Sequence, residues 1–311
     1  MFHTRSSAAL RTACLFACAL LAANLQAQAP DYSKVEYRAE KLADNLQALF
    51  GAGGNIALLT GPDGALVVDS DLVELSAKLR GELALLSDKP VRFLVNTHFH
   101  FDHAGGNTTL GRSGTVIVAQ DNVRKHLMTR QVVNVGVEIA TEPTAREGLP
   151  VVTFADGLRF HLDDEEVVVT HAPNAHTDSD AFVFFEKANV LHTGDVFMSL
   201  GYPFVDAGNG GSLDGVIAGQ QKALALCNEA TRVIPGHGKV VGKAELQAYH
   251  DMLVVVRKRI GDMVRKGRTL EQVQAAAPTK EYDERWGQGF VKPEVFVQRA
   301  YIDLGRARKK G

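Results

Sequence analysis

The stretch "THFHFDHAGG" at residues 97–106 constrains the fold of this chain more than any other feature. It contains four potential metal ligands within six positions: His98, His100, Asp102 and His103. Each of these side chains is costly to bury unless it is paired or binds a metal. The apolar run at 91–97 predicts a strand that ends where the ligands begin. Gly105 and Gly106 then predict an unusual backbone path and a close approach at the start of a helix.

The spacing of these ligands favours two neighbouring metal positions. His98 and His100 can both turn toward one point in a tight loop, whereas the side chains of the adjacent Asp102 and His103 diverge. Further ligands follow apolar strands and small-residue loops downstream: His176 in "APNAHTDSD", Asp195 in "VLHTGD" and His237 in "VIPGHG". Active sites of α/β proteins lie at the carboxyl ends of strands, so these separate loops are expected to converge at one edge.

Short apolar strands alternate with helical patterns along the whole chain. We expect a hairpin from 55–60 and 65–70, further strands at 115–120 and 231–236, and four consecutive strands between 158 and 195. Helices are expected at 73–87, from Asp121 onward, at 213–226 and at 243–267. Residues 131–157 are expected to be irregular, and the chain from about 268 to be mostly helical. This alternation predicts a sheet-rich α/β domain whose sheets are covered by helices.

The motifs together resemble the metallo-β-lactamase superfamily. "THFHFDHAGG" fits the signature T-H-x-H-x-D-H-x-G-G, and His176, Asp195 in "HTGD" and His237 in "PGHG" follow in the family's order. Asp69 in "LVVDS" matches the acidic strand-end residue of that pattern. The resemblance spans about residues 50–240 and implies a four-layer αβ/βα sandwich of two mixed β-sheets with outer helices.

The resemblance also implies a ligand set for two zinc ions. One ion would be bound by His98, His100 and His176, and the other by Asp102, His103 and His237. Asp195 would bridge them, as in the hydrolases of the superfamily that have aspartate at this position.

The resemblance further implies roles for two aspartates in a zinc-dependent hydrolysis. Asp102 would orient the nucleophile and shuttle a proton to the leaving group. Asp69 would accept a hydrogen bond from a ligand imidazole. Imidazole and carboxylate ligands suit zinc first, with iron or manganese possible. Because zinc lowers the pKa of bound water to about 7, a metal-bound hydroxide would attack the carbonyl of an amide, ester or lactone.

The sequence leaves the substrate open. Hydroxyacylglutathione hydrolases and persulfide dioxygenases usually carry a G-C-G-R element after the bridging aspartate, and this chain lacks it. The best-known class of zinc β-lactamases has cysteine at position 195 and lysine three residues later, where this chain has Asp195 and Met198. β-Lactam hydrolysis therefore stays open but is not favoured. The alternatives are a metal-stabilised carrier of the same fold, a thioester hydrolase and an iron-dependent oxygenase.

Substrate contacts are expected from loops at 51–55, 131–150 and 198–212. Tyr202, Phe204 and Asn209 are the candidate pocket residues, and the three glycines of "FGAGGNIAL" are consistent with a mobile flap. His126, His161, His171 and His250 are expected to be ordinary core or surface histidines, and His192 a structural one. Asp178 and Asp180 are expected to make a turn.

The N-terminal residues predict export. Arg5 and Arg11 precede the apolar run "ACLFACALLAA" at 13–23, and small residues follow, which is the pattern of a secretory signal peptide. We expect cleavage near Ala27 or Ala29, a periplasmic or secreted protein, and one domain over 30–311 with a helical C-terminal extension.

Composition narrows the possible partners. The formal net charge is −2, and no long basic stripe indicates nucleic acid binding. The mature chain would keep Cys227 alone, in a helix-like apolar stretch typical of a buried, inert thiol. We expect a small-molecule substrate and no membrane span after cleavage; the oligomeric state is open.

Overall fold

The computed structural model describes residues 31–134 and 138–310, with side chains up to Arg306. The expected signal peptide at 1–29 therefore lies outside the described residues. Every helix and strand of the described residues belongs to one compact unit that begins at Tyr32. Within residues 31–134 and 138–310, no helix combines the length and the hydropathy that a membrane span requires.

The first half of the chain forms a seven-stranded mixed sheet. Its strands, in spatial order, are β1 (Arg38–Lys41), β2 (Leu46–Phe50), β3 (Ile56–Leu59), β4 (Ala65–Val68), β5 (Val91–Val95), β6 (Val116–Gln120) and β9 (Val152–Phe154). The pairs from β1 to β4 are antiparallel, and those from β4 to β9 are parallel. All residues of β3 and β4 are buried, as in strands whose two faces are both covered.

The second half forms a six-stranded mixed sheet. Its strands, in spatial order, are β10 (Gly157–Leu162), β11 (Glu165–His171), β12 (Ala181–Phe185), β13 (Val190–His192), β14 (Arg232–Ile234) and β15 (Val241–Gly242). β13 and β14 run parallel, and the other pairs are antiparallel. β13 and β14 are thus neighbours although about forty residues separate them, which brings the ends that precede Asp195 and His237 together.

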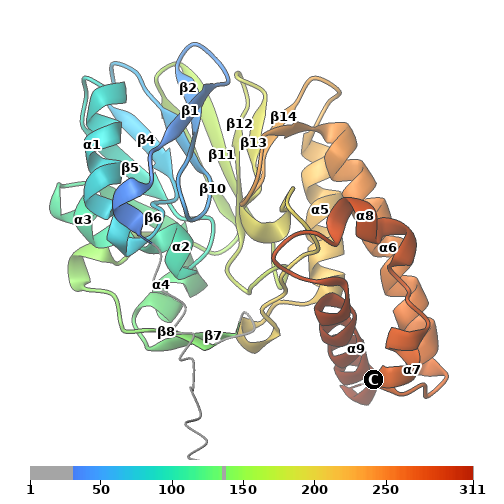
Figure 1. Cartoon of the computed structure of the whole chain (residues 1–311). Coiled ribbons are helices and arrows are strands. Elements are labelled where there is room, and N and C mark those ends of the chain that lie inside the picture. The colour runs from blue at the N-terminus through green and yellow to red at the C-terminus, as the bar shows by residue number, and fades with distance from the viewer. Residues whose placement is uncertain (1–30, 135–137, 311) are drawn as a thin grey trace, which may run out of the picture. The chain divides into compact units, whose positions relative to one another are not determined.

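The two sheets pack face to face, and helices cover their outer faces (Figure 1). One apolar cluster joins Val68 and Val95 of the first sheet to Val169 and Val183 of the second. The outer face of the first sheet packs on α1 (Ser76–Leu86) and α3 (Asn107–Arg112). The outer face of the second packs on α5 (Leu213–Leu226) and α6 (Lys243–Arg265). The expected four-layer αβ/βα sandwich is confirmed.

The remaining helices flank these layers. They are α2 (Phe101–Ala104), α4 (Asp121–Leu127), α7 (Leu270–Ala275), α8 (Asp283–Trp286) and α9 (Pro293–Lys310), with 3-10 turns η1 (Tyr32–Lys34), η2 (Val73–Leu75), η3 (Arg146–Gly148), η4 (Gly194–Val196), η5 (Ala207–Asn209) and η6 (Lys280–Tyr282). α9 packs against α5, α6 and α7.

The expectation that residues 131–157 are irregular is wrong. β7 (Gln131–Asn134) and β8 (Glu138–Thr141) form an antiparallel hairpin, and β9 extends the first sheet beside β6. These strands are three or four residues long and mostly exposed or half-buried. Such short strands carry little hydrophobic periodicity, so pairing with a neighbour decides their conformation.

Candidate metal centre

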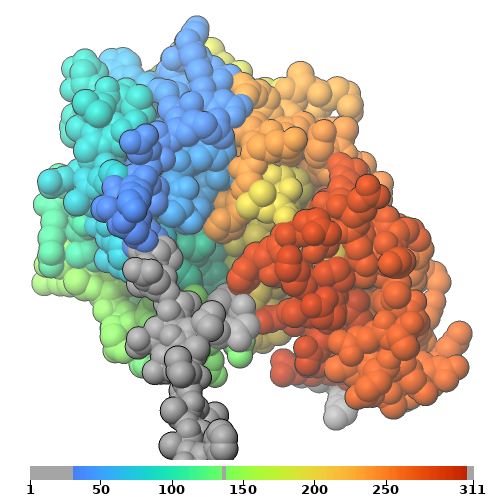
Figure 2. Space-filling view, viewed as in Figure 1, coloured from blue at the N-terminus to red at the C-terminus, as the bar shows by residue number. Residues whose placement is uncertain are grey.

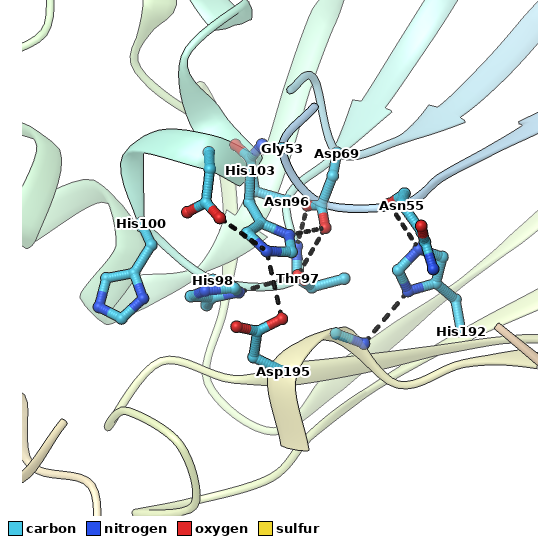
Figure 3. A network of polar contacts seen from close by, with 12 residues as sticks. Gly53, Asn55, Asp69, Asn96, Thr97, His98, His100, His103, His192 and Asp195 are labelled. Atoms are coloured by element: carbon cyan, nitrogen blue, oxygen red, sulfur yellow. Dashed lines mark hydrogen bonds and ion pairs between the residues drawn. The ribbon is translucent and has the colours of Figure 1, made fainter. Parts of the chain in front are cut away.

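The loop that carries the first four ligands is held by a buried carboxylate. Asp69 follows β4, and its side chain accepts hydrogen bonds from the amide and the hydroxyl of Thr97, both at 2.7 Å. Asp69 and Asp71 both have positive φ, 63° and 56°. Aspartate tolerates this left-handed backbone better than most residues, and such strain gathers at functional sites. In Figure 3, dashed lines join the carboxylate of Asp69 to Thr97 and to His103.

Gly105 and Gly106, which follow the candidate ligands, allow the backbone to pack closely against neighbouring segments. A Cβ on Gly106 would lie 2.3 Å from the carbonyl oxygen of Ser70, and one on Gly105 would lie 2.4 Å from the amide of Val73. The expected close approach is therefore present. The expected unusual backbone path is not, because φ is −62° at Gly105 and −80° at Gly106, which is ordinary for L-residues.

His98, His100 and His176 converge on one point. Their ring centroids lie 4.7–4.8 Å apart, and all three side chains are buried. The outer nitrogen of each ring is engaged. Nδ1 of His98 lies 3.0 Å from the Thr97 hydroxyl, Nε2 of His100 lies 3.0 Å from the Asp206 carboxylate, and Nδ1 of His176 lies 2.7 Å from the Phe204 carbonyl oxygen.

These outer contacts leave the inner nitrogen of each ring without a proton, so that its lone pair is free. A ring nitrogen that donates to a carboxylate or a carbonyl carries the proton, so the other nitrogen of the same neutral ring is an acceptor. Nδ1 of His100 nevertheless lies 2.9 Å from Nε2 of His176, and the buried Nε2 of His98 has no hydrogen-bond partner. Three converging lone pairs are the donor set of a metal ion.

Asp102, His103 and His237 form a second group beside the first. Nδ1 of His103 lies 2.7 Å from Asp69, so Nε2 faces inward, 3.3 Å from Nε2 of His237. That nitrogen of His237 lies 3.2 Å from the Asp102 carboxylate. The ligating atoms of the three side chains all lie within 4.8 Å of one another.

Asp195 lies between the two groups. η4, directly after β13, carries this residue, and its buried carboxylate faces His103 (Figure 3). Oδ1 lies 3.2 Å from Nε2 of His103 and 3.5 Å from Nε2 of His237, while Oδ2 lies 3.7 Å from Nε2 of His176. One oxygen thus faces each group, as a bridging ligand requires.

The electrostatics of the centre favour a cation. Burial by itself raises the pKa of Asp195, but His237 and His103 outweigh it and hold that pKa well below its usual value. Asp102 likewise has a pKa of about 2, because His103 and His237 outweigh its burial. Burial and the neighbouring histidines lower the pKa of His98 well below its usual value. Two ionised carboxylates and a neutral His98 are in the protonation states that bind metal. Burial lowers the pKa of His103 and of His237, but the same carboxylates outweigh it and raise both, so these two rings would release a proton when a metal binds.

The structure brings together all seven residues expected as metal ligands: His98, His100, Asp102, His103, His176, Asp195 and His237. Imidazole nitrogens and carboxylates grouped in this way fit divalent metal ions.

Asp206 holds one of the candidate ligands in place, and the sequence did not predict this role. It follows Val205 in the stretch "YPFVD", and its carboxylate is buried against His100. The same carboxylate accepts a hydrogen bond from Nδ2 of Asn209 at 2.7 Å. His100 and Asp206 are 106 positions apart, and no motif links them. This contact selects the tautomer of His100.

A cavity of about 510 Å³ opens on the metal centre. Its lining residues include four candidate ligands, His100, Asp102, Asp195 and His237, together with Leu200, Gly289 and Phe290. Tyr202 is also a lining residue, although its side chain is buried and its hydroxyl donates to Asp283 at 2.8 Å. Phe204 lines the cavity as well, and the Arg299 guanidinium lies 4.7 Å from the centre of its ring. Asn209 lies behind Asp206 and is not a lining residue.

The glycine-rich loop at 51–55 does not line this cavity. Its Gly54 amide donates to the Asp102 carbonyl oxygen at 2.9 Å, and the Asn55 side chain donates to the carbonyl oxygens of Pro235 and Gly238, both at 2.8 Å. Hydrogen bonds thus hold residues 51–55 against the loops that carry Asp102 and His237. This arrangement differs from the mobile flap that was expected.

Two described histidines outside the ligand groups, His192 and His126, have hydrogen-bond partners of their own. Nε2 of His192 lies 3.0 Å from the Asn55 carbonyl oxygen, and its Nδ1 accepts from the Gly194 amide, so it links β13 to the ligand loops (Figure 3). His126 pairs with Asp178 at 2.8 Å and stacks on Phe99. Cys227 is buried, and burial raises the pKa of its thiol, as an inert cysteine requires.

The four-layer sandwich and its ligand-bearing strand ends define a class, the metal-binding αβ/βα proteins. A sequence profile of the metallo-beta-lactamase superfamily matches residues 49–237, and the chain belongs to that superfamily. This confirms the resemblance drawn from the motifs.

Particular relatives differ in length and activity. The chain is 26% identical over 257 residues to the linear primary-alkylsulfatase of Pseudomonas sp. (strain ATCC 19151), covering 70% of this chain and 48% of that protein. The chain thus spans about half the length of this curated relative. The sec-alkylsulfatase Pisa1 from Pseudomonas sp. superposes with a TM-score of 0.64 at 16% identity, over 85% of this chain and 50% of Pisa1. A metallo-beta-lactamase from Pontibacter korlensis gives 0.56 at 18% identity, over 70% and 99% of the two chains.

Proposed function

We propose that this protein is a periplasmic hydrolase with two zinc ions, which adds water across the acyl bond of an ester, lactone or amide. The observation that carries the proposal is the convergence of inner ring nitrogens and ionised carboxylates on two adjacent points at the end of an open cavity. Bound zinc would lower the pKa of water to about 7 and polarise a carbonyl oxygen.

The protein's own residues would position the reactants. Asp102 faces the cavity, and its contact to His237 in the second group orients its carboxylate. In the proposed reaction the hydroxyl of water bonds to the acyl carbon and the acyl–oxygen or acyl–nitrogen bond breaks. Asp102 takes the proton of that water and gives it to the leaving group. Asp69 and Asp206 hold His103 and His100 in the tautomers that leave their inner nitrogens free.

The charges around the cavity favour a neutral substrate over a carboxylate-bearing one. Among the described residues that line it there is no lysine or arginine. A β-lactam antibiotic with a carboxylate would find no cationic partner on this wall, whereas esters and lactones need none.

A sulfate ester with an alkyl group is the second candidate. The likeness to the primary alkylsulfatase covers 70% of this chain, and that to Pisa1 covers 85%, more than the matched superfamily profile. The apolar cavity wall would suit an alkyl group next to the metal centre.

Location in the periplasm rests on the N-terminal pattern alone. Arg5 and Arg11 before the apolar run at 13–23 support it. Detecting the protein, cleaved near Ala27 or Ala29, in a periplasmic extract would test this part.

One experiment separates the candidates. Mature protein beginning near residue 30 is assayed for metal content and for turnover of esters, lactones, thioesters, nitrocefin and an alkyl sulfate. We expect about two zinc ions per chain and chelator-sensitive turnover of esters or lactones. Replacing Asp102 with alanine should abolish turnover, and near-normal turnover with normal metal content would refute its role. Iron retained on purification, together with oxygen consumption, would indicate an oxygenase. If no compound is turned over, the protein would instead be a carrier.

A further inference from the structure

Part of the cavity wall comes from residues beyond the segment that the superfamily profile matches. The chain between α8 and α9 loops back from the outer helices toward the strands (Figure 1). In Figure 2 the orange-red segment that follows α8 reaches toward the hollow in the middle of this face. Its residues Gln288, Gly289 and Phe290 line the same cavity as the metal ligands, whereas the superfamily profile ends at residue 237.

Close backbone contact fixes this segment against the loop after Asp195. A Cβ on Gly289 would lie 2.1 Å from the carbonyl oxygen of Leu200, and a Cβ on Gly201 would lie 2.8 Å from Cα of Gly289. The Tyr202 amide donates to the Trp286 carbonyl oxygen at 3.1 Å. On either side of Phe290, Trp286 and Val291 are buried in the apolar core. The backbone that presents Phe290 is therefore anchored at both ends.

Two large apolar side chains that line the cavity are nevertheless exposed. Phe290 is 65% exposed and Leu200 61%. Single exposed apolar residues are normal on a protein surface, but these two line one cavity that continues to the metal ligands. Met198 and Phe204 add two more apolar side chains to the lining. The described lining residues thus combine the acidic and imidazole side chains of the metal centre with a set of apolar ones.

We propose that Phe290 and Leu200 form a subsite for the linear alkyl chain of the substrate, and that the segment 287–290 sets the preferred chain length. The inference rests on the proposed function, because it places the reacting group on the metal ligands and the chain along the apolar wall. An alkyl chain is the occupant that matches these side chains, since the described lining residues outside the metal centre carry no charge that an ionic group would need.

Binding tests the subsite without turnover. The affinities of acetohydroxamate, butanohydroxamate and octanohydroxamate for the zinc-loaded protein are measured by calorimetry, because the hydroxamate group anchors each ligand on the metals. We expect affinity to rise with chain length by up to roughly fourfold per buried methylene. Replacing Phe290 with alanine should remove most of the gain for octanohydroxamate and leave acetohydroxamate within about twofold. Phe290→Leu should keep most of the gain.

A remote exposed residue supplies the matched control. Leu85 in α1 is 82% exposed and does not line the cavity, so Leu85→Ala should leave all three affinities unchanged. The values of kcat/KM for nitrophenyl acetate, butanoate and octanoate are then measured on the same variants. Chain-length dependence in binding without turnover of any ester would overturn the ester hydrolase and keep the subsite. Ester turnover with equal affinities for all hydroxamates, or equal effects of Phe290→Ala and Leu85→Ala, would overturn the subsite and keep the hydrolase.

Discussion

Asp69 and His103 are joined by a fully buried contact of 2.7 Å between a carboxylate oxygen and Nδ1 of the ring. The same carboxylate accepts from the amide and the hydroxyl of Thr97. Asp69 therefore orients His103, a candidate ligand of the second group. It also fixes the loop that carries His98 and His100 of the first group.

Replacing Asp69 with asparagine should weaken metal binding at the second group. Asparagine keeps the preference for positive φ that this position needs, so the backbone is preserved. It loses an acceptor toward Nδ1 of His103 or toward Thr97. We expect zinc affinity to fall roughly 10–100-fold, measured by competition with a chelator. Unchanged zinc affinity would show that the His103 tautomer is set by another group.

Replacing Asp206 with asparagine should weaken the first group instead. Its carboxylate lies 3.0 Å from Nε2 of His100, and without the charge the tautomer with Nδ1 free is less favoured. We again expect a roughly 10–100-fold loss of zinc affinity. Asp178→Asn, at an aspartate paired with His126, is the matched control and should leave zinc affinity unchanged. Equal effects of both variants would contradict a specific role for Asp206.

Gly236 should tolerate no side chain, for a steric reason. A Cβ there would lie 1.9 Å from Oδ1 of Asp195 and 2.7 Å from the Gly194 carbonyl carbon. We expect Gly236→Ala to lower the free energy of unfolding by about 1–3 kcal/mol and to reduce zinc content. Gly81 is exposed within α1, and a Cβ there would meet no atom within 4 Å. Gly81→Ala should therefore raise stability by about 0.5–1 kcal/mol, and urea unfolding of both variants measures the contrast.

Metal-free and zinc-loaded protein should show opposite pH trends in stability. Burial lowers the pKa of His237, but Asp195 and Asp102 outweigh it and raise that pKa to about 10 in the metal-free protein. A raised histidine pKa contributes stability that is complete below the unfolded value, about 6.5, and is lost as pH rises through about 10. Metal-free protein should therefore lose stability between neutral pH and pH of about 10.

Zinc reverses this dependence, because it binds the deprotonated imidazoles and competes with protons. Zinc-loaded protein should lose stability and metal as the pH falls below about 6. Thermal unfolding of both forms across this range, with zinc content measured in parallel, checks the two trends. Parallel pH profiles for the two forms would show that His237 does not bind the metal.

The sequence alone determined the class of this protein because its signals are local. Apolar runs of strand length predicted most of the two sheets, and ligand residues placed directly after these runs predicted which side chains meet. His176, Asp195 and His237 each carry this signal within a few residues of their own strand. The geometry of parallel strand ends then makes their convergence a consequence of the fold.

Tertiary structure decided what local signals do not encode. The partner that selects a histidine tautomer depends on proximity in space, and Asp206 meets His100 from 106 positions away. The hairpin of β7 and β8 and the added strand β9 are too short to show a period, so pairing decides them. The wall of the cavity at Phe290 arises because Gly289 and Gly201 let two distant backbones touch. The candidate ligands could thus be predicted from the sequence, whereas their orientation and the shape of the neighbouring cavity depend on long-range packing.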